Sequence, residues 1–130
     1  MALLDTDILV NFLRNEETTV QLVRKLQEKS QLATTTINEF ELWKGVYKSK
    51  KEEENKELQN LLSELQIKSF DSRASKKAAF IFEELKSKGE MVDALDVMIA
   101  AIAISQNERL VTFNKKHFER IRGLQLAETQ

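Results

Sequence analysis

Cysteine is absent from the chain, and His117 is its only histidine. The absence of cysteine excludes disulfide bonds and thiolate zinc sites, and it suits a reducing compartment. A single histidine also excludes His-rich metal sites and Cys–His nucleophilic schemes. Any metal site must therefore use oxygen ligands, which magnesium, manganese and calcium prefer.

Proline is absent as well, and no linker or internal repeat interrupts the 130 residues. The N-terminal stretch MALLDTD has neither a basic region nor a long apolar run, so it does not resemble a signal peptide. We therefore expect one cytoplasmic domain over residues 1–130, with enough apolar residues, 42% of the chain, for one core. The net charge of −1 argues against strong non-specific binding of nucleic acid, although it is compatible with a local basic patch.

Strand-like and helix-like segments alternate along the chain. Short apolar or β-prone runs predict strands at 2–4, 31–36, 67–70 and 109–111, with a possible edge strand at 124–126. Helical spacing begins at Ile8 and recurs at 16–29, 37–47, 58–65, 72–88, 91–106 and 115–122. The charged run 48–57 is interpreted as the exposed start of a helix or helical hairpin. This order predicts an α/β fold, namely a three-layer α/β/α sandwich with a short, mainly parallel central sheet.

The segment Met91–Gln106 is apolar on every side from Val97 to Ile104, which predicts a helix buried at the centre of the fold. Two carboxylates, Asp93 and Asp96, stand three residues apart at its start and so share nearly one face. Both can be explained as a helix cap and a first-turn acid. Alternatively, one of them binds a cation at the mouth of a rigid core element.

Further acids follow the first two strands. Asp5 comes directly after the first strand, where open α/β sheets bind their ligands, and a buried acid there needs a partner. Asp7 is expected to be the N-cap of the next helix. Glu39 and Glu41 lie in the 37–47 helix near the end of the second strand. Gly45 in the same helix costs about 1 kcal/mol relative to alanine, and close approach by another backbone would explain it.

A parallel sheet brings these segments to one edge. Asp5, the start of the 37–47 helix, the pair at 93 and 96, and the segment 112–114 are all expected there. Converging carboxylates with no Arg or Lys among them repel one another, and divalent cations remove this repulsion. Two such ions about 4 Å apart generate hydroxide and stabilise the leaving oxygen in phosphodiester hydrolysis.

Four segments, in this order, resemble the PIN-domain ribonucleases, and most closely the VapC-like toxins of prokaryotic VapBC toxin–antitoxin pairs: LLDTDIL, NEFELWKG, LDVMIAAIAI and LVTFNKKHFERIRGLQL. The resemblance covers nearly the whole chain. It implies endonucleolytic cleavage of RNA that depends on Mg²⁺ or Mn²⁺. It also implies a cognate antitoxin protein as partner and a homodimer.

The resemblance carries over to four positions. Asp5 matches the acid at the end of the first strand, and Glu41 matches the Glu that is followed by Leu, two residues and Gly. Asp96 matches the acid before Ile-Ala-Ala in the central helix, which leaves Asp93 outside the pattern. Asn114 holds the fourth position, two residues after a Thr. Because Asn is a weaker ligand than Asp, the implied metal ligands are the other three, and Asn114 is implied only as a catalytic residue.

Three other interpretations remain open. The opening Asp5-Thr6-Asp7 also resembles a haloacid-dehalogenase-type phosphatase, but the late acids open a helix where that fold places an acidic pair after a strand. A receiver-like signalling domain needs a lysine on a late strand, and Lys115 lies too far beyond Val111. A non-catalytic PIN-like domain that only binds a partner is the third.

A toxin and a housekeeping nuclease also remain alternatives at this stage. Basic residues could guide RNA phosphates to the acids, or they could be ordinary surface charge. These residues are Lys44, Lys48, Lys50, Lys51, Lys115, Lys116, Arg120 and Arg122.

Overall fold

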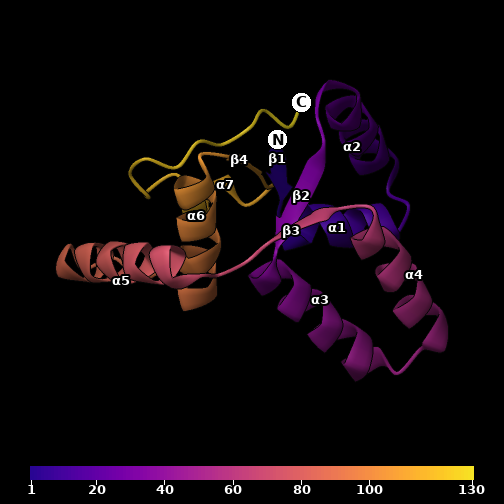
Figure 1. Ribbon diagram of the computed structural model, residues 1–130, viewed down its shortest axis with the longest axis horizontal. Coiled ribbons are helices and arrows are strands. Elements are labelled where there is room, and N and C mark those ends of the chain that lie inside the picture. Colours follow the sequence, from indigo (N-terminus) through magenta and orange to yellow (C-terminus); the bar gives the residue numbers. More distant parts are fainter.

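One four-stranded parallel sheet organises the computed structural model, which describes residues 1–130 (Figure 1). Its strands are β1 (Ala2–Leu4), β2 (Leu32–Thr35), β3 (Gln66–Lys68) and β4 (Arg109–Val111), in the order β3-β2-β1-β4. The helices are α1 (Thr6–Leu13), α2 (Glu17–Lys29), α3 (Thr36–Ser49), α4 (Glu52–Ser63), α5 (Ser72–Ser87), α6 (Ala94–Gln106) and α7 (Lys115–Phe118). The α/β architecture predicted from the sequence is confirmed.

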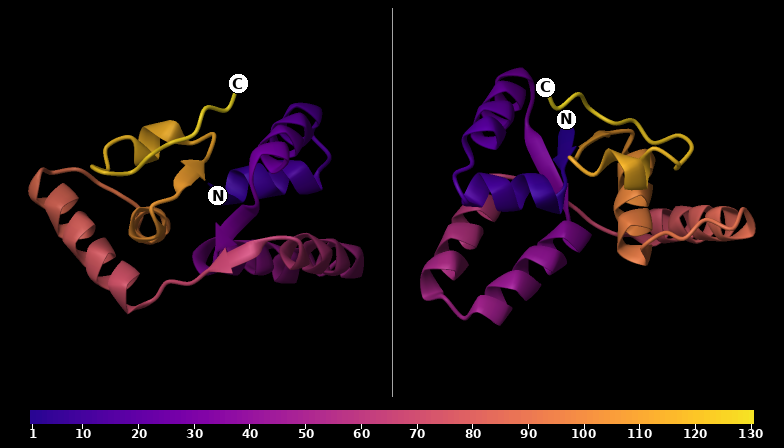
Figure 2. Two further views of the ribbon diagram at one scale, coloured as in Figure 1. Left: turned by 45° about the horizontal axis from the view of Figure 1, so that its top comes forward. Right: turned by 180° about the vertical axis from the view of Figure 1, so that it is seen from behind.

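Side-chain alternation along β1 divides the core into two halves. Leu3 packs with buried residues of α5 and α6, whereas Ala2 and Leu4 pack with α1, α2, α3 and α4. Figure 2 shows α5, α6 and α7 on one side of the sheet and the first four helices on the other. The sheet is therefore the middle layer of three.

Helix α6 is the buried central helix that its composition predicts. Val97 and the run from Ile99 to Ala103 are almost fully buried, and Leu3 of β1 belongs to the same cluster. The alanines of this run leave room for α5, which crosses α6 on the outside (Figure 1). The start of α6 is thereby fixed against the sheet.

Three local expectations are wrong. Asp7 does not cap α1, because the helix begins directly after β1 at Thr6 and Asp5 is the N-cap. The segment 124–126 forms only a single parallel bridge, between Leu110 and Leu126, and is not a strand. No backbone approaches Gly45, since a Cβ built there would meet nothing within 4 Å.

The carboxyl ends of β1, β2 and β4 lie at one edge of the sheet, because neighbouring strands are parallel. Asp5 follows β1, the start of α3 follows β2, and Thr112 follows β4. The start of α6 lies at the same edge. No helix combines the length and the apolar character that crossing a bilayer requires.

Candidate active site

Asp5 is the centre of the polar edge of the sheet, and its side chain is 6% exposed. Its Oδ1 accepts from the backbone nitrogen of Thr6 at 2.9 Å and from Nδ2 of Asn38 at 3.0 Å. Its Oδ2 accepts from the hydroxyl of Thr112 at 2.7 Å. Three donors from three chain segments therefore satisfy and orient a buried carboxylate.

A chain of hydrogen bonds joins Asp5 to Glu41. Nδ2 of Asn38 donates both to Asp5 and, at 2.9 Å, to the hydroxyl of Thr6. The Thr6 hydroxyl donates in turn to Oε1 of Glu41 at 2.6 Å. Oδ1 of Asn38 accepts from the hydroxyl of Thr35 at 2.7 Å, and this bond fixes the orientation of the amide. Glu41 is thereby turned toward α1, whereas the side chain of Glu39 makes no hydrogen bond.

Asp7 is a further acid at this edge, in the first turn of α1. Its Oδ2 accepts from the backbone nitrogen of Phe113 at 3.0 Å, and its Oδ1 is buried without a partner. Burial, together with the negative charge of Asp5, raises the pKa of Asp7 from 3.8 to about 6. An acid without a cationic partner therefore lies within the electrostatic range of Asp5.

Asp96 approaches the same centre from α6. Burial raises the pKa of Asp96, and the charges of Asp5 and Asp93 raise it further. His117 acts in the opposite direction, with Nδ1 lying 3.4 Å from Oδ2 of Asp96. Asn114 reaches the same imidazole, its side-chain amide nitrogen lying 2.9 Å from Nδ1.

The structure therefore groups the four predicted site residues at one edge of the sheet. Asp5 and Glu41 are linked through Asn38 and Thr6, while Asp96 and Asn114 are linked through His117. Asp93 is an exposed N-cap whose carboxylate accepts from the Leu95 nitrogen at 2.8 Å. No Lys or Arg forms an ion pair with any of the acids Asp5, Asp7, Glu41 and Asp96.

The donor chemistry fits a divalent cation. As the side chains stand, no three acidic or histidine side chains are placed to hold a metal ion together. Each predicted ligand nevertheless keeps oxygen lone pairs free. Oδ2 of Asp5 accepts one hydrogen bond, and Oε2 of Glu41 and Oδ1 of Asp96 accept none. Carboxylate oxygens that repel one another and have no Lys or Arg partner are suitable ligands for Mg²⁺ or Mn²⁺.

Sequence reasoning placed the segment 112–114 at this edge but missed the other polar residues that hold these acids, Asn38 and Thr6. Asn38 and Thr112 are fully buried, and Thr6 is half-buried between two acids. The sequence feature that could have identified them is their position, since each lies within a few residues of the carboxyl end of a strand. An Asn that is buried in a helix needs hydrogen-bond partners, so Asn38 could have been recognised as a residue that contacts the site.

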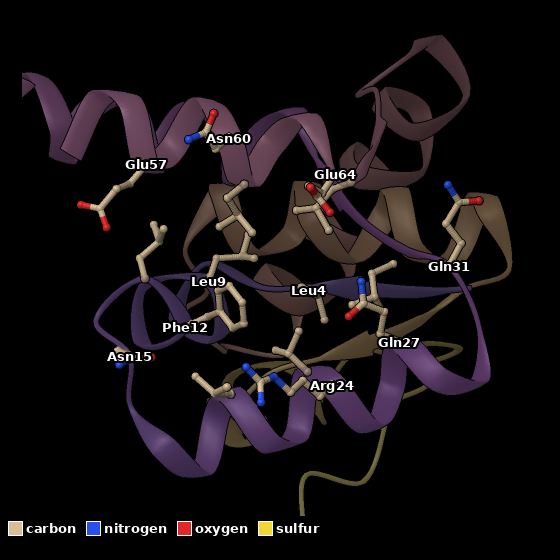
Figure 3. A pocket seen from close by; sticks show the side chains of 16 residues that line it. Leu4, Leu9, Phe12, Asn15, Arg24, Gln27, Gln31, Glu57, Asn60 and Glu64 are labelled. Carbon is tan, nitrogen blue, oxygen red and sulfur yellow. The ribbon is translucent and has the colours of Figure 1, made fainter. Parts of the chain in front are cut away.

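A separate groove of about 770 Å³ lies between α1, α2 and α4. In Figure 3, Leu4, Leu9 and Phe12 line its centre, with polar side chains of α4 and α2 along its two rims. None of the site acids lines it. The groove is therefore a mainly apolar surface distinct from the acidic edge.

Comparison with known proteins places this geometry in a family. The model of the PIN domain family matches residues 2–124. The chain is 35% identical to Ribonuclease VapC2 of Rickettsia felis, over 94% of this chain and 92% of that protein. It is 31% identical to Ribonuclease VapC1 of Methanocaldococcus jannaschii, over 97% of this chain and 86% of that protein.

Similarity to solved structures agrees with the sequence comparison. A crystal structure of VapBC2 from Rickettsia felis, bound to a DNA fragment from their promoter, contains a chain that superimposes with a TM-score of 0.90. The two chains are 33% identical, and the match covers 97% of this chain and 96% of that one. The protein therefore belongs to the PIN-domain family, among its VapC ribonucleases.

Proposed function

We propose that this ribonuclease cleaves RNA phosphodiester bonds with Asp5, Glu41 and Asp96 as ligands of a divalent cation, Mg²⁺ or Mn²⁺. One observation carries the proposal. Asp5, Glu41 and Asp96 lie at one edge of the sheet although they come from different chain segments, no Lys or Arg pairs with them, and the charge of Asp5 helps to raise the pKa of Asp96. A bound cation would neutralise this cluster, activate a water molecule and stabilise the charge on the scissile phosphate.

Each residue contributes a separate task. Asp5 is held rigidly by its three donors, so it presents one free lone pair of Oδ2 in a fixed direction. Thr6 holds one oxygen of Glu41 and leaves the other free. Asp96 is fixed by the start of α6. Asn114 is exposed and uncharged, so its amide can donate to a phosphate oxygen without adding to the repulsion among the acids.

The proposed biological role is that of a toxin that cleaves RNA in the cytoplasm until its antitoxin binds. An antitoxin is the partner that the VapBC relatives support. The apolar groove between α1, α2 and α4 suits an amphipathic segment of such a partner, with Leu4, Leu9 and Phe12 as the buried floor (Figure 3). We also propose a homodimer as the active unit.

The nuclease assignment is tested with purified Asp96→Asn protein. This variant should fold, because Asn is also compatible with a helix start, but it should not cleave single-stranded RNA in the presence of magnesium. Asp93→Asn is the matched control, because it exchanges the same groups at the exposed cap three residues away. Full cleavage by Asp96→Asn would refute the assignment, and so would wild-type cleavage that persists in EDTA.

Isothermal titration with magnesium gives an independent readout. Wild-type protein should bind the ion with measurable heat, and Asp96→Asn should bind it at least tenfold more weakly. Equal affinities would exclude Asp96 as a ligand, whatever its effect on cleavage.

A further inference from the structure

Helix α3 presents aromatic and basic side chains along one side, next to the acid that it contributes to the site. Residues at positions 40, 43, 44, 47 and 48 recur at helical spacing and so share a face. We call this the α3 outer face, made of Phe40, Trp43, Lys44, Tyr47 and Lys48. It begins immediately before Glu41 and extends along the arm that α3 forms with α4 (Figure 1).

Two of the three aromatic residues of this face, Phe40 and Tyr47, do not serve the core, whereas Trp43 is half-buried and packs against it. Phe40 is 54% exposed and Tyr47 is 67% exposed, and neither belongs to a buried cluster. They are instead arranged against one another and against lysine. The rings of Trp43 and Tyr47 stack with centroids 5.9 Å apart, and Nζ of Lys44 lies 5.5 Å from the centre of the Phe40 ring.

The lysines of this face are available for an external partner. Lys44 and Lys48 form no ion pair, whereas Lys51 beyond the end of α3 pairs with Glu54 at 4.0 Å. The nearest acid on the same helix, Glu41, is held by Thr6. The outer face therefore carries two uncompensated positive charges, Lys44 between the exposed rings of Phe40 and Tyr47 and Lys48 directly after Tyr47.

Alternating rings and cations are the chemistry that binds single-stranded nucleic acid, in which bases stack on aromatic faces and phosphates meet lysines. We propose that the α3 outer face is the surface on which the single-stranded part of the RNA substrate lies as it enters the acidic site. This inference rests on the proposed function and assigns that function a substrate-binding surface.

The dimensions agree with this assignment. Phe40 and Tyr47 are seven residues apart, which corresponds to about 10 Å along a helix and to about three stacked nucleotides. A second protein is the less suitable occupant, because lysine is depleted in the centres of protein interfaces. Here Lys44 lies between the two exposed rings.

The test is a binding measurement with a fluorescently labelled single-stranded oligoribonucleotide in EDTA, so that cleavage does not interfere. Phe40→Ala and Tyr47→Ala should each weaken binding about fivefold or more, since each removes a stacking surface. Lys44→Gln should lower the slope of log affinity against log salt by about one. A duplex of the same sequence should bind more weakly, because its bases are already stacked.

Phe80→Ala on α5 is the matched control. Phe80 is 62% exposed, and Nζ of Lys77 lies 5.9 Å from the centre of its ring, so the same kind of pair is removed from a different helix. This variant should bind the oligoribonucleotide like the wild type. An equal loss in Phe80→Ala and Phe40→Ala would show that the effect is not specific to α3.

Trp43 supplies a second readout, because it is the only tryptophan and stacks on Tyr47 within the proposed surface. Binding of the oligoribonucleotide should change its fluorescence, with the same midpoint as the labelled probe. RNA that binds without changing the Trp43 signal, and with unchanged affinity in Phe40→Ala and Tyr47→Ala, would overturn the proposal. So would wild-type protein that does not bind the probe at all.

Sedimentation of the same variants addresses the competing occupant. If the α3 outer face joins two copies of the chain, Tyr47→Ala should lower the mass of the particle and leave RNA affinity unchanged, which would refute the RNA surface. Because binding is measured in EDTA, a failure of this proposal is distinguishable from a failure of metal-dependent cleavage.

Discussion

Asn38 donates a hydrogen bond from Nδ2 to Oδ1 of Asp5 at 3.0 Å, and its side chain is fully buried. The second hydrogen of the same amide goes to the hydroxyl of Thr6, which donates to Glu41. One neutral residue thus holds one proposed cation ligand directly, Asp5, and a second, Glu41, through Thr6, without adding charge. Its oxygen is held by Thr35, so the amide cannot turn over without losing hydrogen bonds.

The first prediction replaces this amide with a carboxylate. Asn38→Asp keeps the size of the side chain but puts an acceptor opposite Asp5 and Thr6. The free energy of unfolding should fall by about 1–3 kcal/mol, and RNA cleavage should fall at least tenfold. Asn60→Asp at an exposed position of α4 is the control and should change neither quantity. Wild-type cleavage in Asn38→Asp would show that the amide does not position the acids.

The second prediction separates Glu41 from Glu39, which point about 200° apart on the helix. Glu41→Gln retains an oxygen for the Thr6 hydroxyl but loses its charge, so cleavage should fall by orders of magnitude and cation affinity should weaken. Glu39→Gln should do little to either, because its side chain makes no hydrogen bond in the site. Single-turnover cleavage and magnesium titration measure both effects. The reverse pattern would assign the ligand role to Glu39.

The third prediction concerns pH and follows from the raised pKa of Asp7, about 6 in the folded chain against 3.8 ordinarily. Between these values the folded state binds more protons than the unfolded state, so the free energy of unfolding falls as pH rises through this window. The shift corresponds to about 3 kcal/mol for a fully buried group and, because Asp7 is partly exposed, to about 1 kcal/mol here.

Asp7→Asn should therefore be more stable than the wild type at pH 7.5, by about 1 kcal/mol, and equally stable near pH 4. Urea denaturation across this range measures the difference. Added magnesium should reduce the advantage, because a cation favours the ionised form of the acid. If the free energy of unfolding depends on pH equally in both proteins, a group other than Asp7 causes that dependence.

The fourth prediction concerns the antitoxin. Acids that form no ion pair with Lys or Arg attract a cationic side chain, and the guanidinium of Arg binds carboxylates in a bidentate manner. We expect the antitoxin to insert an Arg from its tail into the site. Expression of the chain alone should arrest growth, and co-expression of an adjacent small gene that encodes the antitoxin should relieve the arrest. Strong expression of active enzyme without harm would favour a housekeeping role.

A substitution of that arginine in the antitoxin should restore part of the cleavage by the complex. The groove between α1, α2 and α4 would still hold the partner, so the complex itself should persist on size-exclusion chromatography. Complete loss of the complex would mean that the arginine, and not the groove, provides most of the binding energy.

The sequence alone determined the order of elements and the buried central helix. Period and composition are local properties, and a stretch such as Val97–Ile104 has no polar face to expose. The ends of β1 and β4 could also be predicted locally, because the apolar run of each strand stops at a polar residue, Asp5 or Thr112. The exclusion of thiolate and His-rich metal sites needed only the composition.

Only the tertiary structure decided which polar side chains meet. Asp5 and Thr112 are 107 positions apart, yet their side chains are 2.7 Å apart because β1 and β4 are paired in parallel. The structure also assigned the cap of α1 to Asp5, where the sequence favoured Asp7, and showed open space at Gly45. A cap or a glycine can be recognised locally, but its partner depends on strand register and helix packing, which no short stretch of sequence encodes.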